Sequence, residues 1–127
     1  MTAIRLVGTA GDVSLIDDDE LLTLAAPDGM VAISAILGAI DRLGPATHCT
    51  AISENGAYRA CIPLENVHTG GRLAVRRDGK PIPPTDGGPY RLTVEQGATL
   101  CWNVKAVEEF RLSDGPLPDD VPADPTH

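Results

Sequence analysis

The sequence has few aromatic residues, few cysteines and no long apolar run. Only 3% of its 127 residues are aromatic, so Val, Ile, Leu and Ala must fill the core that a chain of this length can build. The three cysteines (Cys49, Cys61 and Cys101) form no CxxC pair and are odd in number, which argues against a disulfide framework. The three histidines are far apart in the sequence, so no zinc-type ligand cluster is visible and no metal ligand is predicted.

Positive charge is also scarce, since the formal net charge is −8. An acidic chain is a poor partner for nucleic acid or for an anionic membrane, because affinity for phosphates needs a basic surface. No charged and then apolar leader opens the chain, and no apolar run reaches the length of a membrane span. We therefore expect a cytoplasmic protein that binds neither nucleic acid nor membranes.

The first third of the chain predicts a short strand at residues 4–7 and two helices. The acidic run at residues 17–20 stands before a leucine pair and suits the positive end of a helix dipole. After a break at residues 27–29, four apolar residues recur at helical spacing, with Ser34 as a candidate N-cap and Gly44-Pro45 as the stop. This apolar stripe consists of Ile33, Ile36, Leu37 and Ile40.

From residue 47 onward the pattern favours strands. Asn55-Gly56 is a two-residue turn signal and predicts a hairpin of residues 47–53 with residues 58–64, in which Cys49 and Cys61 can both face the interior. Asp78-Gly79 predicts a second hairpin, although the prolines that follow it place the return segment at a sheet edge or in a loop.

The last strand candidates are residues 90–94 and 104–112, which complete a strand-rich α+β domain over residues 1–112. From Ser113 the composition shifts to Asp, Pro and Gly with little apolar content. Such a segment cannot bury enough apolar surface to order itself, so residues 113–127 are predicted to be a mobile acidic tail.

Half of the ten basic residues lie between residues 72 and 91, where five cations and two aspartates give a local net charge of +3. Arginine beside glycine-rich backbone suits phosphate or another oxyanion, because guanidinium binds bidentately and glycine lets N–H groups reach the ligand. The alternative is a solvated strand face whose charges keep an edge from pairing with other chains. These basic residues are Arg72, Arg76, Arg77, Lys80 and Arg91.

No nucleophile and base pair is visible in the sequence. The serines lack an elbow motif such as GxSxG. A thiolate pair of Cys101 with His48 or His68 requires a geometry that sequence does not supply. We therefore predict no catalytic residue.

Four segments resemble motifs of the sulfite oxidase family. Residues 73–84 followed by 86–92 are similar to the family's segment LAYxxNGxPLPxxHGxPxRLVVP. Residues 56–64 are similar to its strand GYxxSLPL, residues 103–107 resemble its closing xVKWL, and residues 31–37 resemble its helix VPLxxLL. The resemblance covers about residues 29–112 in the family's order, and it implies a mixed α+β fold that supplies one side of a molybdopterin pocket.

The resemblance also implies the residues of a binding site. The family's arginine after GxP faces the metal and oxyanion pocket and falls on Arg91, and the lysine of the closing motif, near the pterin phosphate, falls on Lys105. Gly87 matches the glycine of the HG pair. With Arg76 and Arg77 from the basic segment, these residues are the predicted cofactor-binding set, and molybdopterin is the predicted cofactor.

The sequence departs from the family at the metal. The family's molybdenum-ligating cysteine precedes the helix, whereas the first 28 residues here contain no Cys or His. Asp86 replaces a histidine, and Trp102 stands at an often basic position. A thiolate is the soft ligand that fixes such a metal, so we expect no bound molybdenum.

We therefore expect a shortened molybdopterin-binding-like module without catalysis of its own, which binds an anionic pterin-type ligand or a partner protein. One alternative is a molybdenum-cofactor-dependent oxidoreductase, or a subunit of one, that completes its site with non-family ligands or another chain. The other is a structural homodimer that pairs through an edge strand near residues 72–84. A fold by itself does not decide among these.

Overall fold

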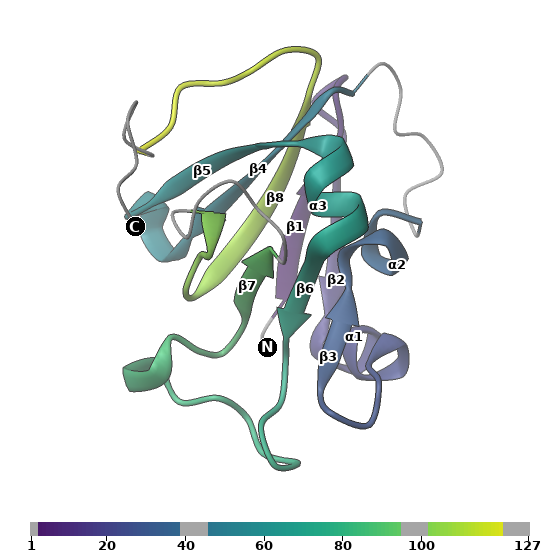
Figure 1. The fold of residues 1–127 in the computed structure, drawn as a ribbon, viewed down its shortest axis with the longest axis vertical. Helices are drawn as coiled ribbons and strands as arrows, with labels where there is room; N and C mark the ends of the chain where they lie inside the picture. Colours follow the sequence, from purple (N-terminus) through teal and green to yellow (C-terminus); the bar gives the residue numbers. More distant parts are fainter. Residues whose placement is uncertain (1–2, 39–45, 95–101, 121–127) are drawn as a thin grey trace.

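The computed structural model describes residues 3–38, 46–94 and 102–120, and it arranges them in two β-sheets with three α-helices (Figure 1). The larger sheet has the strand order β2-β1-β8-β4-β5 and the smaller one β3-β6-β7. Strands β1 and β8 run parallel and all other neighbours are antiparallel. The fold is therefore mixed and strand-rich α+β, as the sequence predicts.

The strands are β1 (Ala3–Val7), β2 (Val13–Asp17), β3 (Met30–Ala32), β4 (His48–Ser53), β5 (Arg59–Pro63), β6 (Gly71–Ala74), β7 (Arg91–Val94) and β8 (Val107–Ser113). The α-helices are α1 (Asp18–Leu24), α2 (Ile33–Gly38) and α3 (Leu64–Gly70), and two short 3-10 turns are η1 (Glu54–Gly56) and η2 (Pro84–Asp86). None of the helices in the described part of the chain has the length and apolar character that a membrane crossing requires.

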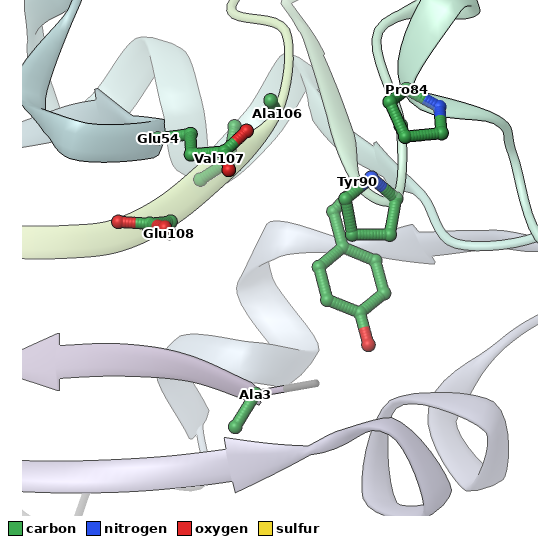
Figure 2. A pocket seen from close by; sticks show the side chains of 9 residues that line it. Ala3, Glu54, Pro84, Tyr90, Ala106, Val107 and Glu108 are labelled. Carbon is green, nitrogen blue, oxygen red and sulfur yellow. The ribbon is translucent and has the colours of Figure 1, made fainter. Parts of the chain in front are cut away.

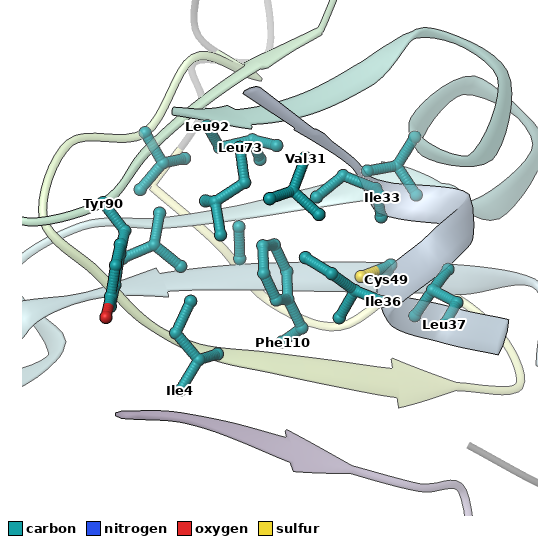
Figure 3. Packing of buried hydrophobic residues seen from close by; sticks show 14 of the residues in the cluster. Ile4, Val31, Ile33, Ile36, Leu37, Cys49, Leu73, Tyr90, Leu92 and Phe110 are labelled. Atoms are coloured by element: carbon teal, nitrogen blue, oxygen red, sulfur yellow. The ribbon is translucent and has the colours of Figure 1, made fainter. Parts of the chain in front are cut away.

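The hydrophobic core lies between the two sheets and is closed at one end by α2. Figure 3 shows Leu73 and Leu92 of the small sheet facing Ile4 and Phe110 of the large one. Aliphatic side chains fill most of this core, and Tyr90 and Phe110 are its largest fully buried members. The scarcity of aromatic residues is thus met by many small contacts, each worth about 0.1–0.2 kcal/mol per atom pair.

Helix α1 begins where the acidic run predicts it. Asp17 is the N-cap, its carboxylate accepts a hydrogen bond from the Glu20 N–H at 2.9 Å, and the Glu20 carboxylate accepts one from the Asp17 N–H. This capping box satisfies two of the N–H groups that a helix start leaves free. The helix buries Leu21 against the core, and capping explains Asp17 and Glu20 of the acidic run.

Helix α2 buries the predicted stripe of Ile33, Ile36 and Leu37. It begins at Ile33, so Ser34 lies within the first turn and the prediction of Ser34 as the N-cap is wrong. The rest of that prediction, Ile40 and Gly44-Pro45, lies outside the described residues.

The hairpin of β4 and β5 confirms the Asn55-Gly56 turn. Both turn residues have positive φ angles, 57° and 68°, which Asn and Gly tolerate best. Cys49 pairs with Ile62 and is fully buried, but Cys61 pairs with Thr50 on the opposite, outer face. The expectation that both thiols face the interior is therefore wrong for Cys61, because neighbours along a strand alternate between faces.

The turn at Asp78-Gly79 is also confirmed, since Arg77 and Lys80 form a β-bridge across it. The prolines that follow keep the return segment in a loop that contains η2. Strand β6 pairs instead with β3 and β7 and lies between them. The expected free edge near residues 72–84 is therefore wrong for β6, whose backbone is paired on both sides.

Residues 114–120 follow β8 and lie along the edge of β5. The Arg59 N–H donates to the Asp120 carboxylate at 2.9 Å, and the Asp120 N–H donates back to the Arg59 carbonyl at 2.9 Å. The Cys61 N–H donates to the Asp119 carboxylate at 2.6 Å. The described part of the acidic tail thus covers a strand edge, while the mobility of the whole tail stays a prediction.

Candidate functional site

The loop between β6 and β7 carries most of the predicted site residues. Proline at positions 81, 83 and 84 removes ladder donors, so this segment cannot continue as a strand. Gly87 ends η2 with a φ of 86°, a left-handed conformation that favours glycine. Its carbonyl accepts a hydrogen bond from the Ala106 N–H at 2.7 Å, which fixes the loop beside the segment before β8.

The structure brings Gly87, Arg91 and Lys105 together. A Cβ atom placed on Gly87 would lie 2.9 Å from Lys105 Cγ and 3.0 Å from Arg91 Nε. Arg91 is half-buried at the start of β7, and Lys105 is exposed just before β8. No ion pair or side-chain hydrogen bond engages either cation within the part of the chain that the structure describes. Two uncommitted cations therefore lie against one glycine.

Arg76 is held by other protein groups. Its Nη1 donates to Asp18 Oδ1 at 2.9 Å, and the Tyr90 hydroxyl donates to the same oxygen at 2.8 Å. The hydrogen bond from Arg76 holds the pKa of Asp18 below its usual value, against the opposing effect of burial. Burial, together with the hydrogen bond to Asp18, raises the pKa of Tyr90. This network joins α1 to the β6–β7 loop, so the guanidinium of Arg76 is already engaged.

Arg77 forms an exposed ion pair with Asp86 across the same loop. The hydrogen bond to Asp86 raises the pKa of Arg77. Exposed pairs of this kind contribute little to stability, so Arg77 exchanges partners at small cost. Asp86, which stands where the family often has histidine, thus holds a cation of the basic segment.

Arg76, Arg77 and Arg91 line one pocket of about 310 Å³ between the β6–β7 loop and strands β3, β6 and β7. Gly87 and Lys105 do not line it, but both lie next to Arg91. Two acidic residues, Asp28 and Asp78, also contribute to its wall. The pocket is at the small end of the range for ligand sites, so it suits one part of a ligand.

A second pocket of about 310 Å³ has Pro84 of η2 in its wall and was not predicted from the sequence. Figure 2 shows the carboxylates of Glu54 and Glu108 on one side, with Pro84 and the Tyr90 ring on the other. Its lining contains no cation, so it does not suit an anion. No sequence signal marks it, because its wall comes from β1, η1, the β6–β7 loop and β8.

The described cysteines do not form a metal site. Cys49 is fully buried, and burial raises the pKa of its thiol to about 12. Cys61 is half-buried, and its Sγ accepts a hydrogen bond from the Leu117 N–H at 3.3 Å. Among the described residues no group of three His, Cys, Asp or Glu side chains is arranged for a metal ion. Cys101 lies outside them, so the structure does not test the geometry that a thiolate pair with His48 or His68 would require.

Comparisons with known proteins support the resemblance. The sequence matches the family model of the oxidoreductase molybdopterin binding domain over residues 28–120. The fold is similar to that of the sulfane dehydrogenase SoxCD from Paracoccus pantotrophus, with a TM-score of 0.74 and 17% sequence identity.

That structural match covers 91% of this chain and 39% of the SoxCD chain, so this chain spans about two fifths of the length of its relative. No curated protein matched the sequence. At 17% identity the structural likeness shows the fold alone, whereas the family match extends over most of the chain. The chain therefore belongs to the family of oxidoreductase molybdopterin binding domains.

Proposed function

We propose that this chain is a binding module of its family, which holds the anionic, phosphate-bearing end of a pterin-type ligand and has no catalysis of its own. The observation that carries the proposal is the approach of Arg91 and Lys105 to Gly87. The two cations come from different segments, and within the described residues neither is neutralised by an acidic partner.

The three residues have complementary roles toward an anion. The guanidinium of Arg91 offers planar, bidentate donors for phosphate oxygens, and the ammonium of Lys105 adds a compact point charge. Because Gly87 has no side chain, Arg91 and Lys105 can both pack against its backbone. In a chain with a net charge of −8, such a local excess of cations selects where an anion binds.

The pocket beside Arg91 gives the ligand a second contact surface. Arg77 faces it from the loop and is held only by an exposed ion pair. Arg76 keeps the loop in place through Asp18, so we assign it to the shape of the pocket more than to the ligand. The acidic wall at Asp28 and Asp78 favours a ligand with uncharged hydrogen-bond donors there, as a pterin ring has.

The described residues fit the phosphate end of molybdopterin but not its metal. When bound, molybdopterin with molybdenum supplies two-electron redox chemistry. Arg91 and Lys105 would hold its phosphate, and Gly87, which has no side chain, would let the two cations lie close together. Cys49 does not fit as a metal ligand, because its thiol is fully buried with a pKa raised to about 12.

The test is pterin analysis of the full chain purified from a host that makes molybdenum cofactor. Oxidation of the released pterin to its fluorescent form should show pterin with little molybdenum. Arg91→Ala and Lys105→Ala should each lower the pterin content at least about tenfold, since each removes a charge-assisted contact. Lys80→Ala is the matched control, because Lys80 is an exposed cation of the same loop and is expected to leave pterin content unchanged. A folded chain without pterin, or equal losses in all three variants, contradicts the proposal.

The alternative is an oxidoreductase subunit that shares its site with another chain. It is favoured by the family's description and by the match to only 39% of the SoxCD chain, a dehydrogenase. This alternative requires molybdenum in near-equal amount to the protein once the other chain is present. Elemental analysis of the complex isolated by pull-down separates the two functions, since the binding module is expected to contain pterin without the metal.

A further inference from the structure

The two edges of the five-stranded sheet differ in whether another segment of the chain covers them. Strand β5 forms one edge and β2 the other. Unpaired N–H and C=O groups at a sheet edge are a template for another strand, and proteins commonly cover or charge them. The edge of β5 is covered by residues 114–120, whose Asp119 and Asp120 bind the backbone of Arg59 and Cys61. No described segment covers β2 in this way.

The free backbone groups of β2 belong to two residues. In the β1–β2 hairpin the Gly8 N–H donates to the Asp12 carbonyl at 2.9 Å. Bonded and non-bonded pairs alternate along an antiparallel ladder, so Ser14 and Ile16 bond to β1 while Val13 and Leu15 direct their N–H and C=O groups outward. The edge thus offers donors and acceptors two residues apart, as an added strand requires.

Val13 and Leu15 also expose their side chains. Val13 is 59% and Leu15 is 64% exposed, the highest values among the large hydrophobic residues that the structure describes as exposed. Both lie on the outer face of the sheet. An added strand would place its own apolar residues beside them as cross-strand neighbours. Val13 and Leu15 therefore offer an added strand both free backbone hydrogen-bonding groups and apolar side chains to pack against.

Charge identifies the chemistry of the partner. Asp12 precedes β2, and Asp17, Asp18 and Asp19 stand at its other end. Arg5 on β1 is already paired with Glu109 at 3.0 Å, and Arg76 is paired with Asp18. Among the described residues no ion pair neutralises Asp12 or Asp19. A second copy of this chain has a net charge of −8 and would bring aspartates against aspartates. A strand with basic ends avoids that repulsion.

We propose that the free edge of β2 binds an extended segment of a partner protein by strand addition. The partner segment alternates apolar residues, which cover Val13 and Leu15, and it carries Lys or Arg at both ends, beside Asp12 and Asp19. Main-chain hydrogen bonds give affinity in this mode and side chains give selectivity. This site is separate from the cationic site of Gly87, Arg91 and Lys105.

The test uses the full chain labelled with ¹⁵N and a synthetic peptide that has lysine at each end and alternating valine and threonine between. Amide shifts should saturate and concentrate on β2 and β1, and hydrogen exchange at Val13 and Leu15 should slow at least about tenfold. A twin peptide with glutamate in place of lysine should bind at least about tenfold more weakly.

Two variants distinguish binding at the β2 edge from a general effect of added positive charge. Leu15→Lys keeps the backbone but adds a cation against the lysine peptide, and it should weaken binding at least about tenfold. Leu22→Lys makes the same change at an exposed leucine of α1 and should leave affinity unchanged. Shifts that avoid β2, or equal affinity for the two peptides, overturn the proposal. Sedimentation that shows a dimer of this chain, dissociated by Leu15→Lys, also overturns it because a second copy would then occupy the edge.

Discussion

At the scale of single residues, two properties of Gly87 disfavour a side chain: its backbone conformation and the closeness of Arg91 and Lys105. Mutation can separate their effects. The φ of 86° at Gly87 disfavours any side chain, and an added Cβ would crowd Lys105 and Arg91. Gly79 has a similar φ of 77°, but a Cβ there would meet no atom within 4 Å. The two glycines of one loop therefore differ mainly in whether a side chain would displace the cations of the proposed anion site.

Gly87→Ala and Gly79→Ala should both destabilise the fold by about 1–2 kcal/mol, the cost of a left-handed alanine. Only Gly87→Ala should also lower pterin content, because its methyl group displaces the side chains of Arg91 and Lys105. Urea unfolding measures the first effect, and fluorescence of the oxidised pterin measures the second. Equal pterin contents in the two variants would remove Gly87 from the site.

At the scale of elements, the edge of β5 depends on two carboxylates of residues 114–120. Asp119 and Asp120 accept hydrogen bonds from the N–H groups of Cys61 and Arg59. In the double variant Asp119→Ala and Asp120→Ala, these two amides should exchange with solvent at least about tenfold faster, since each loses a charged acceptor. Asp114→Ala is the control, because Asp114 is exposed and outside this contact. Unchanged exchange in the double variant would show that the described tail does not protect the edge.

Elements with a local signal could be predicted from the sequence, and those fixed by distant pairing could not. The stripe of α2 and the turn at Asn55-Gly56 follow from residue spacing, and both are present. The position of β6 between β3 and β7 follows from long-range packing, which residues 71–74 alone do not encode. Helix α3 was missed for a related reason. It has no N-terminal side-chain cap hydrogen bond and buries only Val67, so its sequence carries neither an N-cap nor a helical stripe.

The candidate site could be predicted only through the family motifs. Charge clustering indicates Arg72, Arg76, Arg77 and Lys80 as readily as Arg91. It gives no reason to select Lys105, which is 14 residues further along the chain than Arg91. The fold brings these two together because the Gly87 carbonyl binds the Ala106 N–H. Conversely, the ion pair of Arg76 with Asp18 joins residues that are 58 positions apart in the sequence, so no local pattern could indicate it.

At the scale of the whole molecule, Asp18 joins the two sheets. It directly follows β2 of the large sheet, while its partners Arg76 and Tyr90 follow β6 and precede β7 of the small one. The carboxylate is charged in this network, and the hydrogen bond from Arg76 lowers its pKa from the ordinary value of 3.8. A group with a lowered pKa in the folded state stabilises that state above its unfolded pKa. This contribution is lost as the pH falls below about 4 and through the folded-state pKa.

Asp18→Asn should therefore reduce the free energy of unfolding by about 1–3 kcal/mol at pH 7, because Arg76 and Tyr90 then donate to an uncharged acceptor and Arg76 loses its second carboxylate oxygen. The difference from the unmodified chain should shrink as the pH falls below about 4 and through the lowered pKa of Asp18 in the folded state. Urea unfolding across this range measures it, with Asp19→Asn as the control for the charge of the same helix turn. A difference that stays constant as the pH falls through this range would mean that packing of the Asp18 side chain, not its charge, accounts for its contribution to stability.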